Sequence, residues 1–355
     1  MTTLAEFSHQ LKQGFRPREQ NPTKPVRYWH EQDRLNDTIV DAFVIILRTE
    51  GCSWARTSGC TMCGYFNDSL WKPLSSSDLL TQFETAMKSY QNEPLVKIFT
   101  SGSFLDPQEI PLQVQQHILK KLATTTKKIS VESRPEYITE ETLSSLTSLL
   151  GTTTLELGIG LETANDILRA KTINKGFTFK DYTTAVSTAK KHSCSIKTYF
   201  LVKPPFITEQ AAIDDCIQSI QHIRDLTDII SLNPTNIQRR TIVEYLWKRH
   251  HYRPPWLWSI ITILKQGKAI APQVHLKCDV AGGGSFRGAH NCKQCNTQFL
   301  KQIDDFSLSQ DSSQLDGLTC NTCHDTWLDQ LELEDLGFGS FTDIERMDRY
   351  AHAYC

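Results

Sequence analysis

The sequence predicts an α/β protein: a partial (β/α)6 TIM-like barrel followed by a small C-terminal cysteine-rich metal-binding domain. Six short apolar runs alternate with amphipathic segments of helix length, and three cysteines directly follow the first run. A second group of cysteines lies near the C-terminus. Such alternation is typical of parallel strands joined by crossover helices, and barrels of this kind have their active sites at the carboxyl ends of the strands.

The expected strands and helices follow one another in order along the chain. The strands are expected at 41–49, 95–102, 127–135, 154–162, 195–205 and 228–235, and the helices between them at 75–91, 107–123, 139–151 and 177–192. The first and third helices open with Ser or Thr and an acidic residue close behind, which is typical of a helix N-terminus. We therefore expect an N-terminal extension at 1–38, the barrel at 39–265 and the cysteine-rich domain at 266–355.

Composition and charge narrow the class of protein. The 355 residues are 39% hydrophobic and 22% charged, which is ordinary for a globular chain. No window approaches the roughly 18 uncharged apolar residues of a spanning helix, so a cytoplasmic protein is expected. Eleven cysteines in such a protein indicate thiolate ligands or catalysis rather than disulfides. The net charge of −2 means that binding to nucleic acid would need a local basic face or a partner.

Cys52, Cys60 and Cys63 lie in the loop that follows the first expected strand. Three thiolates with one position left open suit a 4Fe-4S cluster whose fourth iron binds a small molecule. A structural zinc site normally has four protein ligands, and the next cysteine in the sequence is Cys194. A zinc site with a distant fourth ligand, and plain buried thiols, are the alternative interpretations.

This cysteine loop after the first strand of a β/α repeat resembles the radical S-adenosylmethionine superfamily, although the spacing CxxxxxxxCxxC is longer than the commonest CxxxCxxC. The segment 155–178 resembles the corresponding part of the Elongator-like branch of that superfamily. The resemblance implies that S-adenosylmethionine is bound by residues at successive strand ends. These are Met62, Gly102, Ser103, Glu132, Arg134, Glu156, Gly158 and Glu162.

A narrower resemblance rests on segments 51–65, 100–106, 131–137, 232–247, 252–259 and 289–295. Together they resemble the radical S-adenosylmethionine subunits of archaeal archaeosine synthases. This implies a lyase that works with a lysine-adding, transglycosylase-like partner. It would cleave the C–N bond of a lysine adduct of 7-cyano-7-deazaguanine at position 15 of tRNA, leaving archaeosine.

Four polar residues at the ends of the fifth and sixth expected strands are candidates for orienting the lysine or the deazaguanine: Lys203, Asn233, Gln238 and Arg239. Two other functions stay open for the whole chain. One is another radical modification of tRNA. The other is a redox-inert zinc-binding adaptor that docks the partner on tRNA.

The C-terminal cysteines form two CxxC pairs separated by 24 residues: Cys292, Cys295, Cys320 and Cys323. Each CxxC supplies two adjacent thiolates, and two pairs complete a tetrahedron, so this spacing predicts structural zinc. The alternative is an auxiliary iron–sulfur cluster that Cys278 joins.

Overall fold

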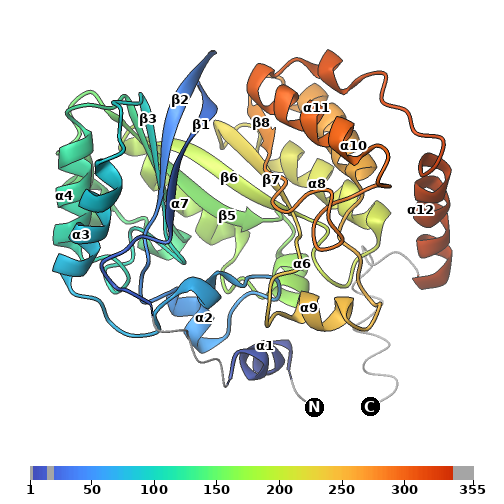
Figure 1. Ribbon diagram of the computed structural model, residues 1–355, viewed down its shortest axis with the longest axis horizontal. Helices are drawn as coiled ribbons and strands as arrows, with labels where there is room; N and C mark the ends of the chain where they lie inside the picture. The colour runs from blue at the N-terminus through green and yellow to red at the C-terminus, as the bar shows by residue number, and fades with distance from the viewer. Residues whose placement is uncertain (1–2, 14–19, 339–355) are drawn as a thin grey trace.

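One sheet of eight strands, in the order of the sequence, forms the centre of the computed structural model, which describes residues 3–13 and 20–338. The first two strands pair antiparallel and all later neighbours are parallel (Figure 1). The strands are β1 (Arg27–Leu35), β2 (Thr38–Ile46), β3 (Leu95–Phe99), β4 (Lys128–Glu132), β5 (Thr154–Glu162), β6 (Ser195–Val202), β7 (Ile229–Pro234) and β8 (His275–Cys278). The six expected strands are β2 to β7, so the predicted α/β partial barrel is confirmed.

The two edge strands, β1 and β8, lie outside the range 39–265 that the sequence predicts for the barrel. β1 reads RYWHEQDRL and is mostly exposed or half-buried, so it lacks the apolar run that marks the inner strands. β8 has only four residues. Both strands nevertheless belong to the sheet, because β1 pairs with β2 along its whole length and β8 pairs with β7.

Helices connect the strands and cover the outer face of the sheet (Figure 1). Ser75 with Asp78 and Thr178 with Asp181 form reciprocal capping boxes at the starts of α3 and α7. The longer helices of the barrel are α3 (Ser76–Met87), α4 (Leu112–Leu122), α5 (Glu140–Thr147), α7 (Phe179–Lys191), α8 (Glu209–Ile223) and α10 (Leu257–Ile270). The others are α1 (Leu4–Lys12), α2 (Ser53–Thr57), α6 (Asp166–Leu168), α9 (Ile242–Trp247), α11 (Asn296–Ser309) and α12 (His324–Phe338). Of the helices in 3–13 and 20–338, none has the length and apolar character needed to cross a membrane.

The strands alternate between an apolar outer face and a polar inner face. Val96 and Ile98 on β3 are completely buried and belong to the main core cluster, while Lys97 between them lines the interior of the barrel. The same period of two places Glu132, Gly158 and Gly160 toward the interior. Many inner positions are charged, polar or glycine, beside Ile46, Phe99 and Leu201, so the barrel encloses a cavity with polar groups instead of a closed hydrophobic core.

Candidate active site

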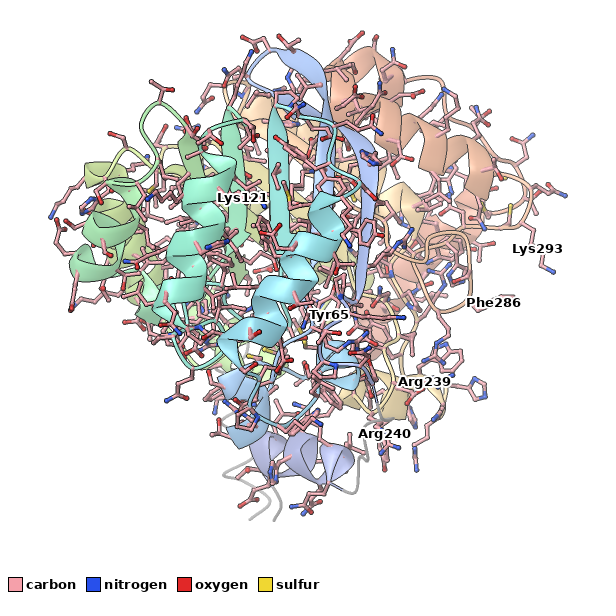
Figure 2. The ribbon with its side chains drawn as sticks, turned by 60° about the vertical axis from the view of Figure 1, so that its left-hand side comes forward. Tyr65, Lys121, Arg239, Arg240, Phe286 and Lys293 are labelled. Atoms are coloured by element: carbon pink, nitrogen blue, oxygen red, sulfur yellow. The ribbon has the colours of Figure 1, made fainter. Side chains whose placement is uncertain are left out.

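A cavity of about 410 Å³ lies inside the barrel, where the carboxyl ends of the strands meet the cysteine loop. Figure 2 shows Tyr65 of that loop and Arg239 on the same side of the molecule, toward its lower end. The sequence-predicted residues that line the cavity are Cys52, Cys60, Met62, Cys63, Gly102, Glu132, Arg134, Gly158, Glu162, Asn233 and Gln238. The fold therefore brings most of the predicted site together from segments far apart in the sequence.

The cysteine loop is held from three sides. Lys12 of α1 donates from Nζ to the carbonyl oxygen of Ser58 at 3.2 Å. Thr61 donates from its backbone N–H to the carbonyl oxygen of Ile173 at 3.0 Å. Gly64, next to Cys63, donates its backbone N–H to Oε1 of Gln238. These contacts fix a loop that has no regular strand or long helix of its own.

The three thiols of this loop line the cavity together. Burial raises the pKa of Cys63 to about 12 and also raises the pKa of Cys52. Both would therefore be neutral thiols unless a metal replaced the proton. Within residues 3–13 and 20–338, the three sulfurs do not form a set within 4.8 Å of one another, as a single tetrahedral ion requires. Three thiolates that line one cavity could hold a polynuclear iron–sulfur cluster.

Gly102 lets the end of β3 pass directly against the cysteine loop. A Cβ at this position would lie 2.7 Å from Cys52 Cα, closer than side chains pack. Glu109 supports the turn by accepting from Thr49 Oγ1 and from the backbone N–H of Ser103, both at 2.6 Å. Burial raises the pKa of Glu109 to about 7. The sequence did not single out Glu109, although it lies only seven residues after Gly102.

The glycines of β5 leave space for side chains that reach in from neighbouring elements. A Cβ at Gly158 would lie 2.9 Å from the Tyr199 ring, and a Cβ at Gly160 would lie 2.6 Å from Lys175 Nζ. Lys175 pairs with Glu162 at 2.5 Å. β5, Tyr199 and Lys175 together form a cradle that lines the same cavity as the cysteine loop, where a cofactor such as S-adenosylmethionine could bind.

Glu162 and Arg134 hold the mouth of this cradle. Glu162 has a φ of +67° at a shift in the β5–β6 register, an uncommon conformation for a residue other than glycine. Arg134 donates from Nη1 to the carbonyl oxygen of Lys175 at 2.9 Å, and its guanidinium lies 5.4 Å from the centre of the Trp54 ring. Strained backbone of this kind is common where a ligand binds.

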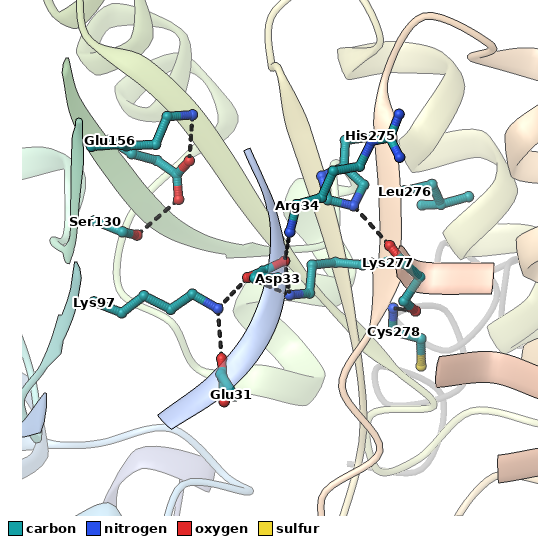
Figure 3. Close-up of polar contacts among 12 residues, drawn as sticks. Glu31, Asp33, Arg34, Lys97, Ser130, Glu156, His275, Leu276, Lys277 and Cys278 are labelled. Atoms are coloured by element: carbon teal, nitrogen blue, oxygen red, sulfur yellow. Dashed lines mark hydrogen bonds and ion pairs between the residues drawn. The ribbon is translucent and has the colours of Figure 1, made fainter. Parts of the chain in front are cut away.

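Four of the predicted residues do not line the cavity. Ser103 is buried behind it and accepts from the backbone N–H of Arg134 at 3.0 Å. Glu156 pairs with Lys128 at 3.1 Å and accepts from Ser130 Oγ at 2.8 Å (Figure 3). The structure thus places these two residues in the walls of the barrel.

The other two predicted residues that lie outside the cavity, Lys203 and Arg239, were expected to orient the substrate. Lys203 forms an ion pair with Glu209 at 2.7 Å, and both side chains are almost completely buried. Arg239 is exposed, and its carbonyl oxygen accepts from Asn67 Nδ2 at 3.1 Å. Asn233 and Gln238 are the substrate candidates that face the cavity.

Several cavity residues were not predicted from the sequence: Trp29, Glu31, Lys97, Lys175, Lys197, Tyr199, Lys277 and Asp279. A usable signal existed in part, because Lys97, Lys197 and Lys277 are single charges within otherwise apolar strand sequences. Trp29 and Glu31 lie on β1, which only the pairing with β2 identifies as part of the barrel.

The C-terminal cysteines form a separate and more compact group. The sulfurs of Cys292, Cys295, Cys320 and Cys323 all lie within 4.8 Å of one another. Trp258 Nε1 donates to Cys323 Sγ at 3.4 Å. Four sulfurs at this spacing fit one tetrahedral metal ion. Cys278 lies on β8, outside this group.

The fold and the cysteine loop define the class of protein, an α/β partial barrel with three cysteines at the cavity where the carboxyl ends of its strands meet. No family model matches the chain. It is 41% identical over 335 residues to archaeosine synthase subunit beta of Methanosarcina acetivorans, covering 93% of this chain and 96% of that one. It is 35% identical over 307 residues to the subunit of the same name from Thermococcus kodakarensis, covering 84% and 94% of the two chains. The chain therefore belongs to the archaeosine synthase subunit beta family.

Solved structures share parts of the fold at low sequence identity. The archaeal Elp3 of Methanocaldococcus infernus is 15% identical, with a TM-score of 0.46 over 69% of this chain and 60% of that chain. Methylornithine synthase is 15% identical, with a TM-score of 0.45 over 66% and 64%.

Proposed function

We propose that the chain is the radical S-adenosylmethionine subunit of an archaeosine synthase. In this role it cleaves the C–N bond of a lysine adduct of 7-cyano-7-deazaguanine at position 15 of tRNA and leaves archaeosine. One observation carries the proposal: the three cysteines open into the same cavity as the glycine cradle of β5, in a chain of this family.

Cys52, Cys60 and Cys63 would hold a 4Fe-4S cluster. The β5 cradle, together with Gly102 after β3, would hold S-adenosylmethionine. When bound and reduced, this pair supplies the 5′-deoxyadenosyl radical that removes hydrogen from the lysine carbon next to the nitrogen. The residues of the chain position the reactants and exclude water. Gly102 lets β3 pack against the cysteine loop, Gly158 makes room for Tyr199, and the Lys175–Glu162 pair fixes the cradle at the mouth of the cavity.

The substrate would enter from the side of the cavity opposite the cradle. Asn233 and Gln238 face that side and can donate and accept hydrogen bonds from a deazaguanine. Lys203 and Arg239 were predicted for the same role, and their present contacts are with Glu209 and Asn67. Alanine substitution at each of the four positions tests this assignment, because near-normal product formation by all four variants would contradict it.

The C-terminal cysteines would hold a structural zinc ion. In the described residues this group packs against the barrel through Trp258, which stacks on Trp327 with ring centroids 6.0 Å apart. A metal at this point would fix the C-terminal segment on α10, since Trp258 belongs to that helix.

Two relatives are named as subunit beta, so we propose a partner subunit that adds lysine and resembles a transglycosylase. With a net charge of −2, the isolated chain should bind tRNA weakly, because phosphate contacts dominate such binding. Tight, salt-sensitive binding of tRNA by the chain alone would contradict this part of the proposal.

The experiment that tests the function is a single-turnover reaction. The protein, reconstituted and reduced without oxygen, is mixed with S-adenosylmethionine and tRNA that already carries the lysine adduct. We expect archaeosine in the digested tRNA and 5′-deoxyadenosine in the supernatant, both detected by mass spectrometry. The Cys52, Cys60 and Cys63 triple alanine variant should form neither. Failure of the iron-loaded parent to form archaeosine would overturn the proposal.

A further inference from the structure

One half of the cavity has no role in the proposed cofactor binding. The predicted cofactor residues that line the cavity come from the cysteine loop and the ends of β3 to β5. The rest of the wall is built by β6 to β8 and by β1, and it carries Glu31, Lys197 and Lys277, with Lys97 reaching toward it from β3. A charged group of the substrate that the proposed cofactor site does not contact could bind at this wall.

Two carboxylates of this wall are already neutralised by two lysines (Figure 3). Asp33 accepts from Lys277 Nζ at 2.9 Å and pairs with Lys97. Lys97 also pairs with Glu31 at 2.6 Å. These four side chains form a closed network in which each charge has an opposite partner.

Lys197 is the cation left over. Its side chain is buried, with 4% of the residue exposed, and it faces the cavity from β6. In the part of the chain that the structure describes, it has no ion pair and donates no hydrogen bond, and its ammonium lies 5.0 Å from the centre of the Tyr199 ring. Burial, together with the like charges of Lys277 and Lys97, lowers the pKa of Lys197 to about 8, while the more distant carboxylates of Glu156 and Asp33 oppose this shift. Burying a charge without an ion-pair partner costs free energy, unless a bound ligand supplies the opposite charge.

We propose that Lys197 binds a carboxylate of the substrate, namely the amino-acid end of the lysine adduct. This inference rests on the proposed function. The carboxylate lies at the far end of the lysine side chain from the bond that breaks. Lys197 is level with Gly158 in the sheet register, deeper than Gly160 and Glu162, so it lies below the mouth of the barrel. With the base held at the mouth, the amino-acid end reaches toward Lys197.

The methionine carboxylate of S-adenosylmethionine is a second source of the same chemistry. The residues predicted to hold the methionine lie at the end of β3, at the end of β4 and just after it, and one of them, Glu132, is level with Lys197 in the sheet register. The experiment therefore measures the two ligands separately.

The probes are free-base adducts of 7-cyano-7-deazaguanine with lysine and with 1,5-diaminopentane, which matches lysine but lacks the carboxylate. Binding of each adduct and of S-adenosylmethionine is measured by calorimetry with the parent, Lys197→Met and Lys197→Arg. Lys121→Met is the matched control, because Lys121 is exposed and pairs with Glu84 on the outer helices (Figure 2).

We expect the parent to bind the lysine adduct at least tenfold more tightly than the diaminopentane adduct, since a hydrogen bond to a charged group strengthens binding by more than that factor. Lys197→Met should bind the two adducts equally, Lys197→Arg should restore the preference in part, and affinity for S-adenosylmethionine should not change. Because Lys197→Met removes a buried cation that has no ion pair, its melting temperature should be equal to or higher than that of the parent.

Three results would overturn the inference. Equal affinity of the parent for both adducts would show that no carboxylate is recognised, while turnover of lysine-modified tRNA would still support the proposed function. Weaker binding of S-adenosylmethionine alone in Lys197→Met would assign the carboxylate to the cofactor. A lower melting temperature with an unchanged preference would make Lys197 structural. Failure of the parent to convert lysine-modified tRNA would instead overturn the proposed function itself.

Discussion

Asp33 on β1 pairs with Lys277 on β8, so a single carboxylate joins the two edges of the sheet, which share no backbone ladder. The distances from Lys277 Nζ to the two carboxylate oxygens are 2.9 and 3.1 Å. Arg34, the next residue, donates from Nη1 to the carbonyl oxygen of Leu308 on α11 at 3.1 Å. The partial barrel is thus closed by side chains where strand pairing ends.

Asp33→Asn should destabilise the barrel by about 3 kcal/mol, because it removes the carboxylate partner of buried Lys97 and half-buried Lys277. Urea unfolding measures this loss. Asp37→Asn is the control, since Asp37 is fully exposed and pairs with Arg34 only at the surface. If the two variants unfold at the same urea concentration, the ion pair does not hold the edges together.

Gly102→Ala should prevent assembly of the iron site, because its Cβ would collide with the backbone of Cys52. Neither the end of β3 nor the cysteine loop can move without breaking the contacts of Glu109. Iron per chain after reconstitution is the measurement. Gly151→Ala provides the comparison: its Cβ meets nothing within 4 Å, and its φ of +56° costs only about 1 kcal/mol. Full iron loading of Gly102→Ala would contradict the packing argument.

Lys203→Met should lower stability by about 3 to 5 kcal/mol, because Glu209 would keep a buried charge without its partner. Glu209 also accepts from the backbone N–H of Trp256 at 2.8 Å and from Ser259 Oγ at 2.5 Å. The added substitution Glu209→Gln should recover most of the loss in thermal melts. A stable double variant that forms no archaeosine would support the predicted substrate role of Lys203, and one with normal turnover would assign the pair to structure.

His275 should make stability depend on pH. Burial lowers the pKa of His275 to about 4, and Nε2 donates to the carbonyl oxygen of Ser307 at 3.0 Å. In the unfolded chain His275 has an ordinary pKa near 6.5. Between about pH 6.5 and 4 the unfolded chain therefore binds a proton that the folded protein does not bind. Stability should therefore be full above about pH 6.5 and fall by on the order of 2 kcal/mol as the pH drops toward 4. Denaturant unfolding of the parent and of His275→Gln from pH 4.5 to 7 is the measurement. Equal slopes of the unfolding free energy against pH in the two proteins would refute the prediction.

Much of the barrel could be predicted because its inner strands are marked by apolar runs and its helices by capping residues such as Ser75 and Thr178. β1 could not, since its polar face lines the cavity and its identity depends on pairing with β2. The cysteine loop was visible from local spacing alone.

The substrate side of the site was harder to predict for a physical reason. A charged residue in a strand or just after one looks the same in sequence whether it faces a cavity or forms a buried pair. Lys203 and Lys197 show the difference: the first meets Glu209, while the second faces the cavity with no carboxylate partner in the described residues. Only the fold decides which partner each lysine meets.

The most direct test of the central claim is the metal content of the protein purified and reconstituted without oxygen. We expect about four irons and one zinc per chain, with an electron paramagnetic resonance signal of the reduced protein that changes when S-adenosylmethionine is added. The Cys52, Cys60 and Cys63 triple alanine variant should lose the iron and keep the zinc. Iron that persists in this variant, or a parent that takes up only zinc, would contradict the account.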